Sequence, residues 1–95
     1  MKIILCCELQ LKSGSRDLLV SRIRQNDLEH CVQCEPGNLD YRFLLPIGHD
    51  DSLTIMEVWA SEHDLAQHKA GANVKLWHQI ADAYIVGRKH QQYSV

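Results

Sequence analysis

Three stretches of the chain alternate between apolar and polar positions with the two-residue period of a β-strand. The first stretch, residues 2–11, has one fully apolar face, made by Ile3, Leu5, Cys7, Leu9 and Leu11. Residues 39–45 and 53–59 alternate in the same way. We expect a short fourth strand over residues 84–89, in which Gly87 marks a bulge. The pattern therefore predicts four strands.

A helix is predicted between the first two strands, because residues 16–33 contain neither glycine nor proline. Ser15 is the expected N-cap, and Pro36-Gly37 ends the segment. Steps of three and four residues place Asn26 and His30 on the apolar stripe of this helix. Polar groups on such a stripe either bond to neighbouring elements, lie at an edge facing water, or face a cavity.

The second predicted helix begins near Glu62. Ser61 and Asp64 nearly match the capping-box pattern of a helix N-terminus. Gly71 is expected to break the helix, and further helical turns then lead towards residue 84. Leu65 and His68 lie three residues apart, so they share a face of this helix.

The element order β-α-β-β-α-β is that of the ferredoxin-like α+β fold. In that fold both helices cover one face of a four-stranded antiparallel sheet. The other face would here carry apolar side chains, among them Ile4, Met56 and Val58. A second copy packed sheet to sheet would bury them, so we expect a homodimer. The polar tail, residues 91–95, is expected to be loose or to contact the partner subunit.

Composition restricts the class of protein. The chain has 95 residues, 45% of them hydrophobic and 23% charged, as expected for one folded domain over residues 1–95. The net charge is -2 with scattered lysines and arginines, which argues against a nucleic-acid partner. The longest apolar run near the start ends at Glu8, too early for a membrane span or a signal peptide. We therefore expect a cytoplasmic protein.

The four cysteines do not form a convincing metal or redox motif. Cys6 and Cys7 are adjacent in a strand, so their side chains point to opposite faces. Cys31 and Cys34 have the spacing of a redox pair but fall at the end of a helix. Thiolates are stabilised at the beginning of a helix, not at its end. No metal site is expected.

Two motifs resemble the antibiotic biosynthesis monooxygenase family. One is the strand end Glu57-Val58-Trp59 followed nine residues later by His68. The other is Asn26 before the turn Glu35-Pro36-Gly37 and the aromatic strand of Tyr41. The likeness extends over nearly the whole chain. It implies a dimeric ferredoxin-like α+β barrel with pocket residues Asn26, Tyr41, Glu57, Trp59 and His68.

Many members of that family resemble cofactor-independent monooxygenases of quinols or polycyclic phenols. Such a phenol loses a proton to a base and then reduces dioxygen itself, so neither metal nor flavin is required. His68 would be the base or proton relay, because histidine titrates near neutral pH. Glu57 would orient it or carry protons, and Asn26 would stabilise an oxyanion. Trp59 would form a wall of the pocket.

Two other enzyme classes and one non-catalytic role remain open. The run Arg24-Gln25-Asn26 and the segment 36–39 resemble the isomerase of a phosphorylated ketose in the autoinducer-2 pathway. That reaction needs a phosphate site, for which Arg24, Lys69 and Lys75 are candidates.

Haem-degrading relatives carry a ligand histidine at the place of His78. In this chain, however, Cys7 and His68 replace two residues typical of that branch. A dimer that only binds a small molecule would share the same fold.

Overall fold

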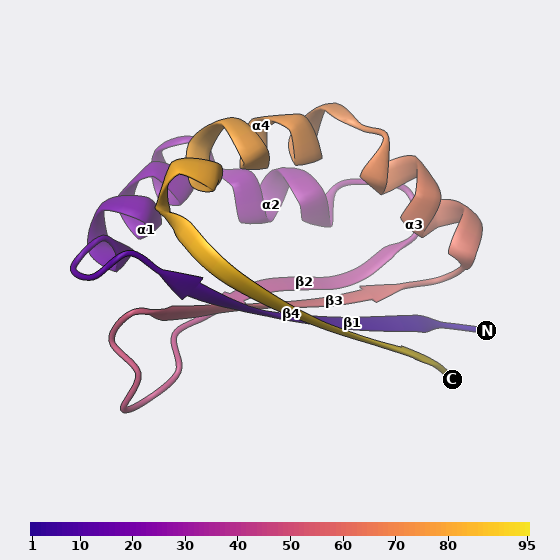
Figure 1. The fold of residues 1–95 in the computed structure, drawn as a ribbon. Helices are drawn as coiled ribbons and strands as arrows, with labels where there is room; N and C mark the ends of the chain where they lie inside the picture. The colour runs from indigo at the N-terminus through magenta and orange to yellow at the C-terminus, as the bar shows by residue number, and fades with distance from the viewer.

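The computed structural model describes all residues, 1–95. Its elements are β1 (Ile3–Leu11), α1 (Arg16–Gln25), α2 (Leu28–Gln33), β2 (Asn38–Leu44), β3 (Ser52–Trp59), α3 (Glu62–Lys69), α4 (Ala72–Ala81), a short 3-10 helix (Asp82–Tyr84) and β4 (Ile85–Ser94). The strands form one antiparallel sheet in the order β2-β3-β1-β4. All four helices cover the same face of this sheet (Figure 1). The predicted ferredoxin-like α+β fold is confirmed, with a sheet that does not close within one chain.

The core lies between the sheet and the helices. The face of β1 that alternation predicts to be apolar points into it, and Ile3, Leu9 and Leu11 are almost fully buried. On β3, Leu53, Ile55 and Trp59 are buried on the same side. Helix residues complete the cluster: Leu19, Ile23, Leu28, Val32, Leu65, Ile80 and Ala81. The apolar faces predicted for the strands and for the helices thus pack against each other in one core.

The first predicted helix is in fact two helices. α1 ends at Gln25, and Asp27 adopts a left-handed conformation with φ 49° before α2 begins. The turn rotates the apolar stripe, which resumes at Leu28 and Val32 instead of passing through Asn26 and His30. Both polar residues are consequently exposed, which corresponds to the water-facing alternative. Ser15 also makes no N-cap bond, since its hydroxyl donates to the Lys12 carbonyl instead.

The second helical region follows the prediction closely. The Ser61 hydroxyl accepts a hydrogen bond from the Asp64 amide at 3.1 Å, which caps α3. Gly71 separates α3 from α4. Where β4 pairs with β1, the register shifts beside Gly87, as the bulge prediction requires.

The last strand is longer than predicted. It continues to Ser94, so the tail is paired with β1 over most of its length and is not loose. Pairing of the backbone holds this edge strand although most of its side chains are polar and exposed.

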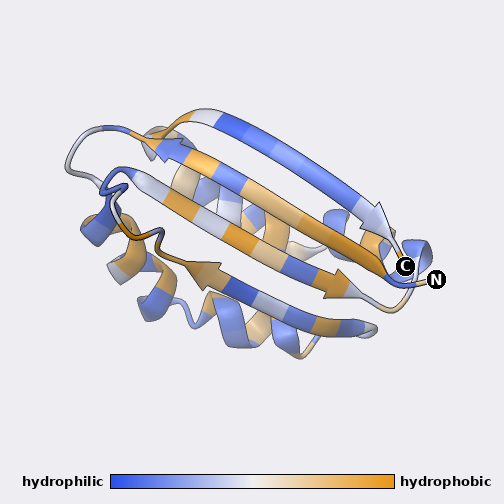
Figure 2. Cartoon of the chain, turned by 90° about the horizontal axis from the view of Figure 1, so that it is seen from below, coloured by the Kyte–Doolittle hydropathy of each residue, from blue (hydrophilic) through white to orange (hydrophobic).

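The face opposite the helices is open (Figure 2). Ile4, Met56 and Val58 are half-buried on that face although no element covers them. No helix has the length and apolar character needed to cross a bilayer.

Candidate functional site

A cavity of about 420 Å³ lies between the sheet and helices α2, α3 and α4. This volume is within the range of small-molecule sites, about 300–1,000 Å³. Its walls are largely apolar, and every strand contributes to them. The lining residues are Leu5, Cys7, Leu9, Val32, Tyr41, Ile55, Glu57, Leu65, His68, Lys69, Asn73, Val74, Trp77, His78, Arg88, His90 and Gln92.

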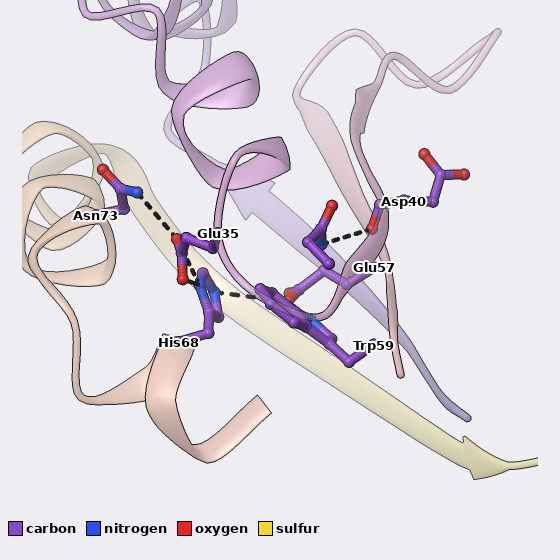
Figure 3. A network of polar contacts seen from close by, with 7 residues as sticks. Glu35, Asp40, Glu57, Trp59, His68 and Asn73 are labelled. Atoms are coloured by element: carbon purple, nitrogen blue, oxygen red, sulfur yellow. Dashed lines mark hydrogen bonds and ion pairs between the residues drawn. The ribbon is translucent and has the colours of Figure 1, made fainter. Parts of the chain in front are cut away.

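His68 lies between two carboxylates at one end of this cavity (Figure 3). Its Nδ1 is 3.0 Å from both carboxylate oxygens of Glu35. Its Nε2 is 3.6 Å from Oε1 of Glu57. Because an ionised carboxylate only accepts hydrogen bonds, we assign the imidazole hydrogen to Nδ1, facing Glu35. The side chain of His68 is only 6% exposed, so water competes little for these contacts.

Each carboxylate has a further partner that fixes its position. The indole Nε1 of Trp59 donates to Oε1 of Glu57 at 2.9 Å. The amide nitrogen of Asn73 donates to Oε2 of Glu35 at 2.9 Å (Figure 3). The Trp59 ring also lies against the imidazole of His68, with ring centroids 4.6 Å apart. The array is therefore held rigidly before any ligand binds.

Local backbone structure brings these side chains together. Glu57 and Trp59 are two residues apart on β3, so both point to the helix side of the sheet. His68 is on the inner face of α3, which begins at the Ser61 cap directly after β3. The turn that carries Glu35 is held next to the end of β3, because the Ala60 amide donates a hydrogen bond to the Gly37 carbonyl at 2.8 Å.

Two acidic groups in the cavity wall are held in the neutral form. Burial raises the pKa of the Tyr41 phenol far above its ordinary value, and the nearby Glu57 carboxylate adds to this effect. Burial, assisted by Glu57, also raises the pKa of the Cys7 thiol to about 11. Tyr41 therefore keeps its hydroxyl hydrogen, and Cys7 is a poor nucleophile at neutral pH.

The opposite end of the cavity carries basic side chains. Asp82 holds two of them: Nδ1 of His78 and a guanidinium nitrogen of Arg88 each lie 3.0 Å from its Oδ1. His90 is nearby on β4, and its Nε2 is 3.8 Å from the Cys7 sulfur. Asp82 itself is not part of the cavity lining.

The structure brings some of the six sequence-predicted site residues together and leaves others apart. His68, Glu57 and Tyr41 line the cavity. Trp59 is fully buried behind it and touches the site only through Glu57 and His68.

The remaining two predicted residues lie elsewhere. The amide of Asn26 donates to the Arg22 carbonyl in the connection between α1 and α2. Arg24 borders a separate hollow near α2. Both were assigned from the family resemblance. The structure leaves both exposed and outside the cavity lining, with Arg24 in the last turn of α1 and Asn26 directly after it.

Sequence reasoning did not assign a role to Glu35 or Asn73. Glu35 was noted only as part of a turn, and its contact with His68 spans 33 residues of sequence. One signal was present: a carboxylate directly before Pro36-Gly37 cannot continue the helix, so its side chain is free to reach another element. Asn73 follows the break at Gly71 and gave no such signal.

Neither a metal cluster nor a disulfide accompanies this array. No group of three or more histidine, cysteine or acidic side chains is arranged to hold a metal ion. All four cysteines are free, and Cys31 and Cys34 are exposed on the outer side of α2.

Comparison with known proteins agrees with this architecture. A Nitrosomonas europaea protein, provisionally named as an antibiotic biosynthesis monooxygenase, superposes with a TM-score of 0.87 over 98% of this chain and 97% of its own, at 18% identity. The Pseudomonas aeruginosa protein PA3566 superposes with a TM-score of 0.86 over 99% of this chain and 93% of its own, at 17% identity. At these identities the likeness shows the fold alone. No curated protein sequence matches significantly.

The sequence itself matches a family model. The model is described as antibiotic biosynthesis monooxygenase, and it covers residues 3–80, which include β1 to β3 and nearly all the helices. The resemblance seen in the two sequence motifs is thereby confirmed. This chain belongs to the antibiotic biosynthesis monooxygenase family.

Proposed function

We propose that the protein is a cofactor-independent monooxygenase that oxidises a quinol or polycyclic phenol with dioxygen. One observation carries the proposal: the imidazole of His68 lies between the carboxylates of Glu35 and Glu57 at the end of a largely apolar cavity. Such an array accepts a proton from a phenol and moves it away from the reacting ring. Monooxygenase-like chemistry is also what membership of the family supports.

The proton path follows from the contacts. Glu57 and His68 both line the cavity, so a phenol hydroxyl placed there donates its proton to this pair. His68 accepts at Nε2 and releases its Nδ1 hydrogen to Glu35. The proton thus leaves the cavity without entering solvent. The Tyr41 hydroxyl, kept neutral by burial, donates to the developing oxyanion.

The redox step uses only the phenolate and dioxygen. The electron-rich ring carbon transfers electrons to dioxygen and forms a C–O bond. For a ring methylene, the O–O bond then breaks, one oxygen stays as a carbonyl, and the other leaves as water with both hydrogens. Apolar walls such as Val74 and Trp77 exclude bulk water from the reactive intermediate.

Isotope labelling tests this proposal. An anthrone is incubated with the protein under ¹⁸O-labelled dioxygen, and the product is analysed by mass spectrometry. One labelled oxygen in the quinone, formed faster than without protein, is the expected result. Unlabelled product, or the same rate with and without protein, would reject the monooxygenase.

A phosphoketose isomerase is the second candidate, because an imidazole between two carboxylates also shuttles protons between carbons beside a ketone. Of the three residues predicted as phosphate ligands, only Lys69 lines the cavity. Arg88 also lines it, but the sequence did not predict it as a phosphate ligand. An isomerase would exchange substrate hydrogen with deuterated water in the absence of oxygen, whereas the monooxygenase would not turn over.

Haem degradation is the least favoured of the alternatives. His78 lines the cavity, but Cys7 and His68, which also line it, replace two residues that are typical of the haem-degrading relatives. The carboxylate–imidazole array suits proton transfer instead.

The homodimer also stays a proposal, supported by the open sheet face. Its half-buried Ile4, Met56 and Val58 would become fully buried against a second sheet, which is how the α+β barrel of the fold prediction would form. A dimer that only binds a ligand would share this arrangement and would show no oxygen uptake.

A further inference from the structure

The two ends of the cavity differ in charge. At one end the ionisable array is Glu35, His68 and Glu57, with two carboxylates. At the other end the lining side chains are Arg88, His78 and His90, and no carboxylate lines the cavity there. A ligand that crosses the cavity therefore meets an acidic array at one end and cationic or donor groups at the other.

The separation of the ends follows from the strand register. Glu57 pairs with Leu5 on β1, and Leu5 pairs with Gln92 on β4. Arg88 lies two strands across from Glu57 and four residues along β4, which places the two Cα atoms about 16 Å apart. Since both side chains reach inwards, a ligand of two or three fused rings spans the remaining gap.

The basic end is positioned by a side chain outside the cavity. Asp82 accepts from His78 and Arg88 through the same oxygen, at 3.0 Å each. This bond uses one of the five N–H donors of Arg88 and leaves the others for a ligand. With Nδ1 of His78 engaged by Asp82, its Nε2 is the ring nitrogen left for a ligand. A guanidinium in this setting binds a carboxylate or phosphate through charge-assisted, often bidentate, hydrogen bonds.

We infer that the natural ligand is a fused-ring aromatic with an anionic group at the end remote from its reacting hydroxyl, and that Arg88 binds this group. The inference deepens the proposed function and rests on it in one respect, namely that the His68 end is the reacting end. Arg88 determines which substrate is held, and His68 carries out proton transfer. Lys69, the other cation of the lining, belongs to α3 beside His68 and does not mark the remote end.

Binding of two matched probes tests the inference without any turnover. The probe 6-hydroxynaphthalene-2-carboxylate carries its hydroxyl and its anion at opposite ends of two fused rings. The corresponding carboxamide has the same shape and no charge. Titration calorimetry at low salt, where exposed charges are least screened, gives both dissociation constants.

We expect the wild-type protein to bind the carboxylate at least about tenfold more tightly than the carboxamide, as one charge-assisted hydrogen bond provides. Arg88→Gln should abolish this preference and change carboxamide binding little. Arg88→Lys should retain part of it, because the charge remains. Arg22→Gln, on the exposed side of α1, is the matched control and should bind as the wild type does.

Equal binding of the two probes, binding of neither, or a preference that survives in Arg88→Gln would overturn the inference. Oxygen uptake with an uncharged naphthohydroquinone is measured on the same proteins. A charge preference without uptake would reject the proposed monooxygenase and keep the anion site. Uptake that depends on His68, without a charge preference, would reject the anion site alone.

Discussion

Glu35 does not itself line the cavity, yet both of its carboxylate oxygens lie 3.0 Å from Nδ1 of His68, which does. Its position makes it the group that fixes the imidazole and removes its proton. In general a histidine that carries protons depends on such an acceptor for its tautomer. Among the residues that do not touch the substrate, Glu35 is therefore the one whose substitution should affect catalysis most.

Glu35→Gln should lower kcat by about a hundredfold and leave KM nearly unchanged, since the imidazole loses its orientation and its proton acceptor. The pH profile of kcat should change as well, which loss of packing alone would not cause. Glu62→Gln, on the exposed side of α3, is the control and should behave as the wild type. An unchanged kcat in Glu35→Gln would contradict the proton path.

Because the pKa of Tyr41 is raised in the folded protein, we expect the protein to lose stability at alkaline pH. Burial raises this pKa, so the unfolded chain loses the phenol proton first as the pH increases. The contribution of Tyr41 to the free energy of unfolding is fully present below about pH 10, the ordinary pKa of tyrosine, and it decreases above that pH. Cys7 adds a loss between its ordinary value of 9.0 and about 11.

Urea unfolding near pH 8 and near pH 10.5 measures this effect. Tyr41→Phe removes one titrating group and should lose less stability between the two conditions than the wild type. Tyr93→Phe, on an exposed ring, is the matched control and should lose as much as the wild type. Equal losses in the wild type and in Tyr41→Phe would show that the buried phenol does not titrate as described.

At the scale of elements, the contact between the α2–β2 turn and the start of α3 positions the site. Gly37 has φ +76°, and a Cβ there would overlap the side chain of Asp64. Asp64 in turn is bonded to Ser61 at the N-terminus of α3. The turn that carries Glu35 and the helix that carries His68 thus share one closely packed junction.

Gly37→Ala should destabilise the protein by more than the roughly 1–2 kcal/mol that left-handed backbone alone costs an alanine. Gly14→Ala isolates that backbone cost, because Gly14 has the same φ and no atom lies within 4 Å of its added Cβ. Urea unfolding of the two variants gives the difference. If both lose the same free energy, the junction is not tightly packed.

The elements also show what sequence patterns can and cannot reveal. Alternation identified β1 and β3, because one of their faces is buried in the core and must be apolar. It underestimated β4, an edge strand held by backbone pairing whose polar side chains carry little pattern. The break at Asp27 was missed because a left-handed aspartate lacks the signal that glycine or proline gives.

The same limit applies to the site. Glu57 and His68 were predicted to be site residues because they belong to one local motif, and the structure places both in the cavity. Asn26 was taken as a pocket residue from the family resemblance, and in the structure it is exposed at the end of α1, outside the cavity lining. Glu35 acts through a contact 33 residues away, which no local pattern encodes.

At the scale of the whole molecule, the open face of the sheet predicts the oligomeric state. Val58→Lys places a charge in the middle of the proposed sheet-to-sheet interface and should produce monomers. Leu18→Lys puts the same charge on an exposed site of α1 and should leave the dimer intact. Light scattering coupled to size-exclusion chromatography measures both. A wild-type protein that is monomeric at micromolar concentration would reject the dimer.

In the proposed reaction His68 removes a proton from a phenol that dioxygen then oxidises. The most direct test is oxygen uptake by the metal-free protein with a panel of hydroquinones and anthrones, comparing the wild type with His68→Ala. His63→Ala, on the exposed side of the same helix, is the control. We predict uptake that falls by about 10²–10⁴-fold in His68→Ala and is unchanged in His63→Ala. No uptake by the folded wild-type protein, or equal uptake by His68→Ala, would contradict the account.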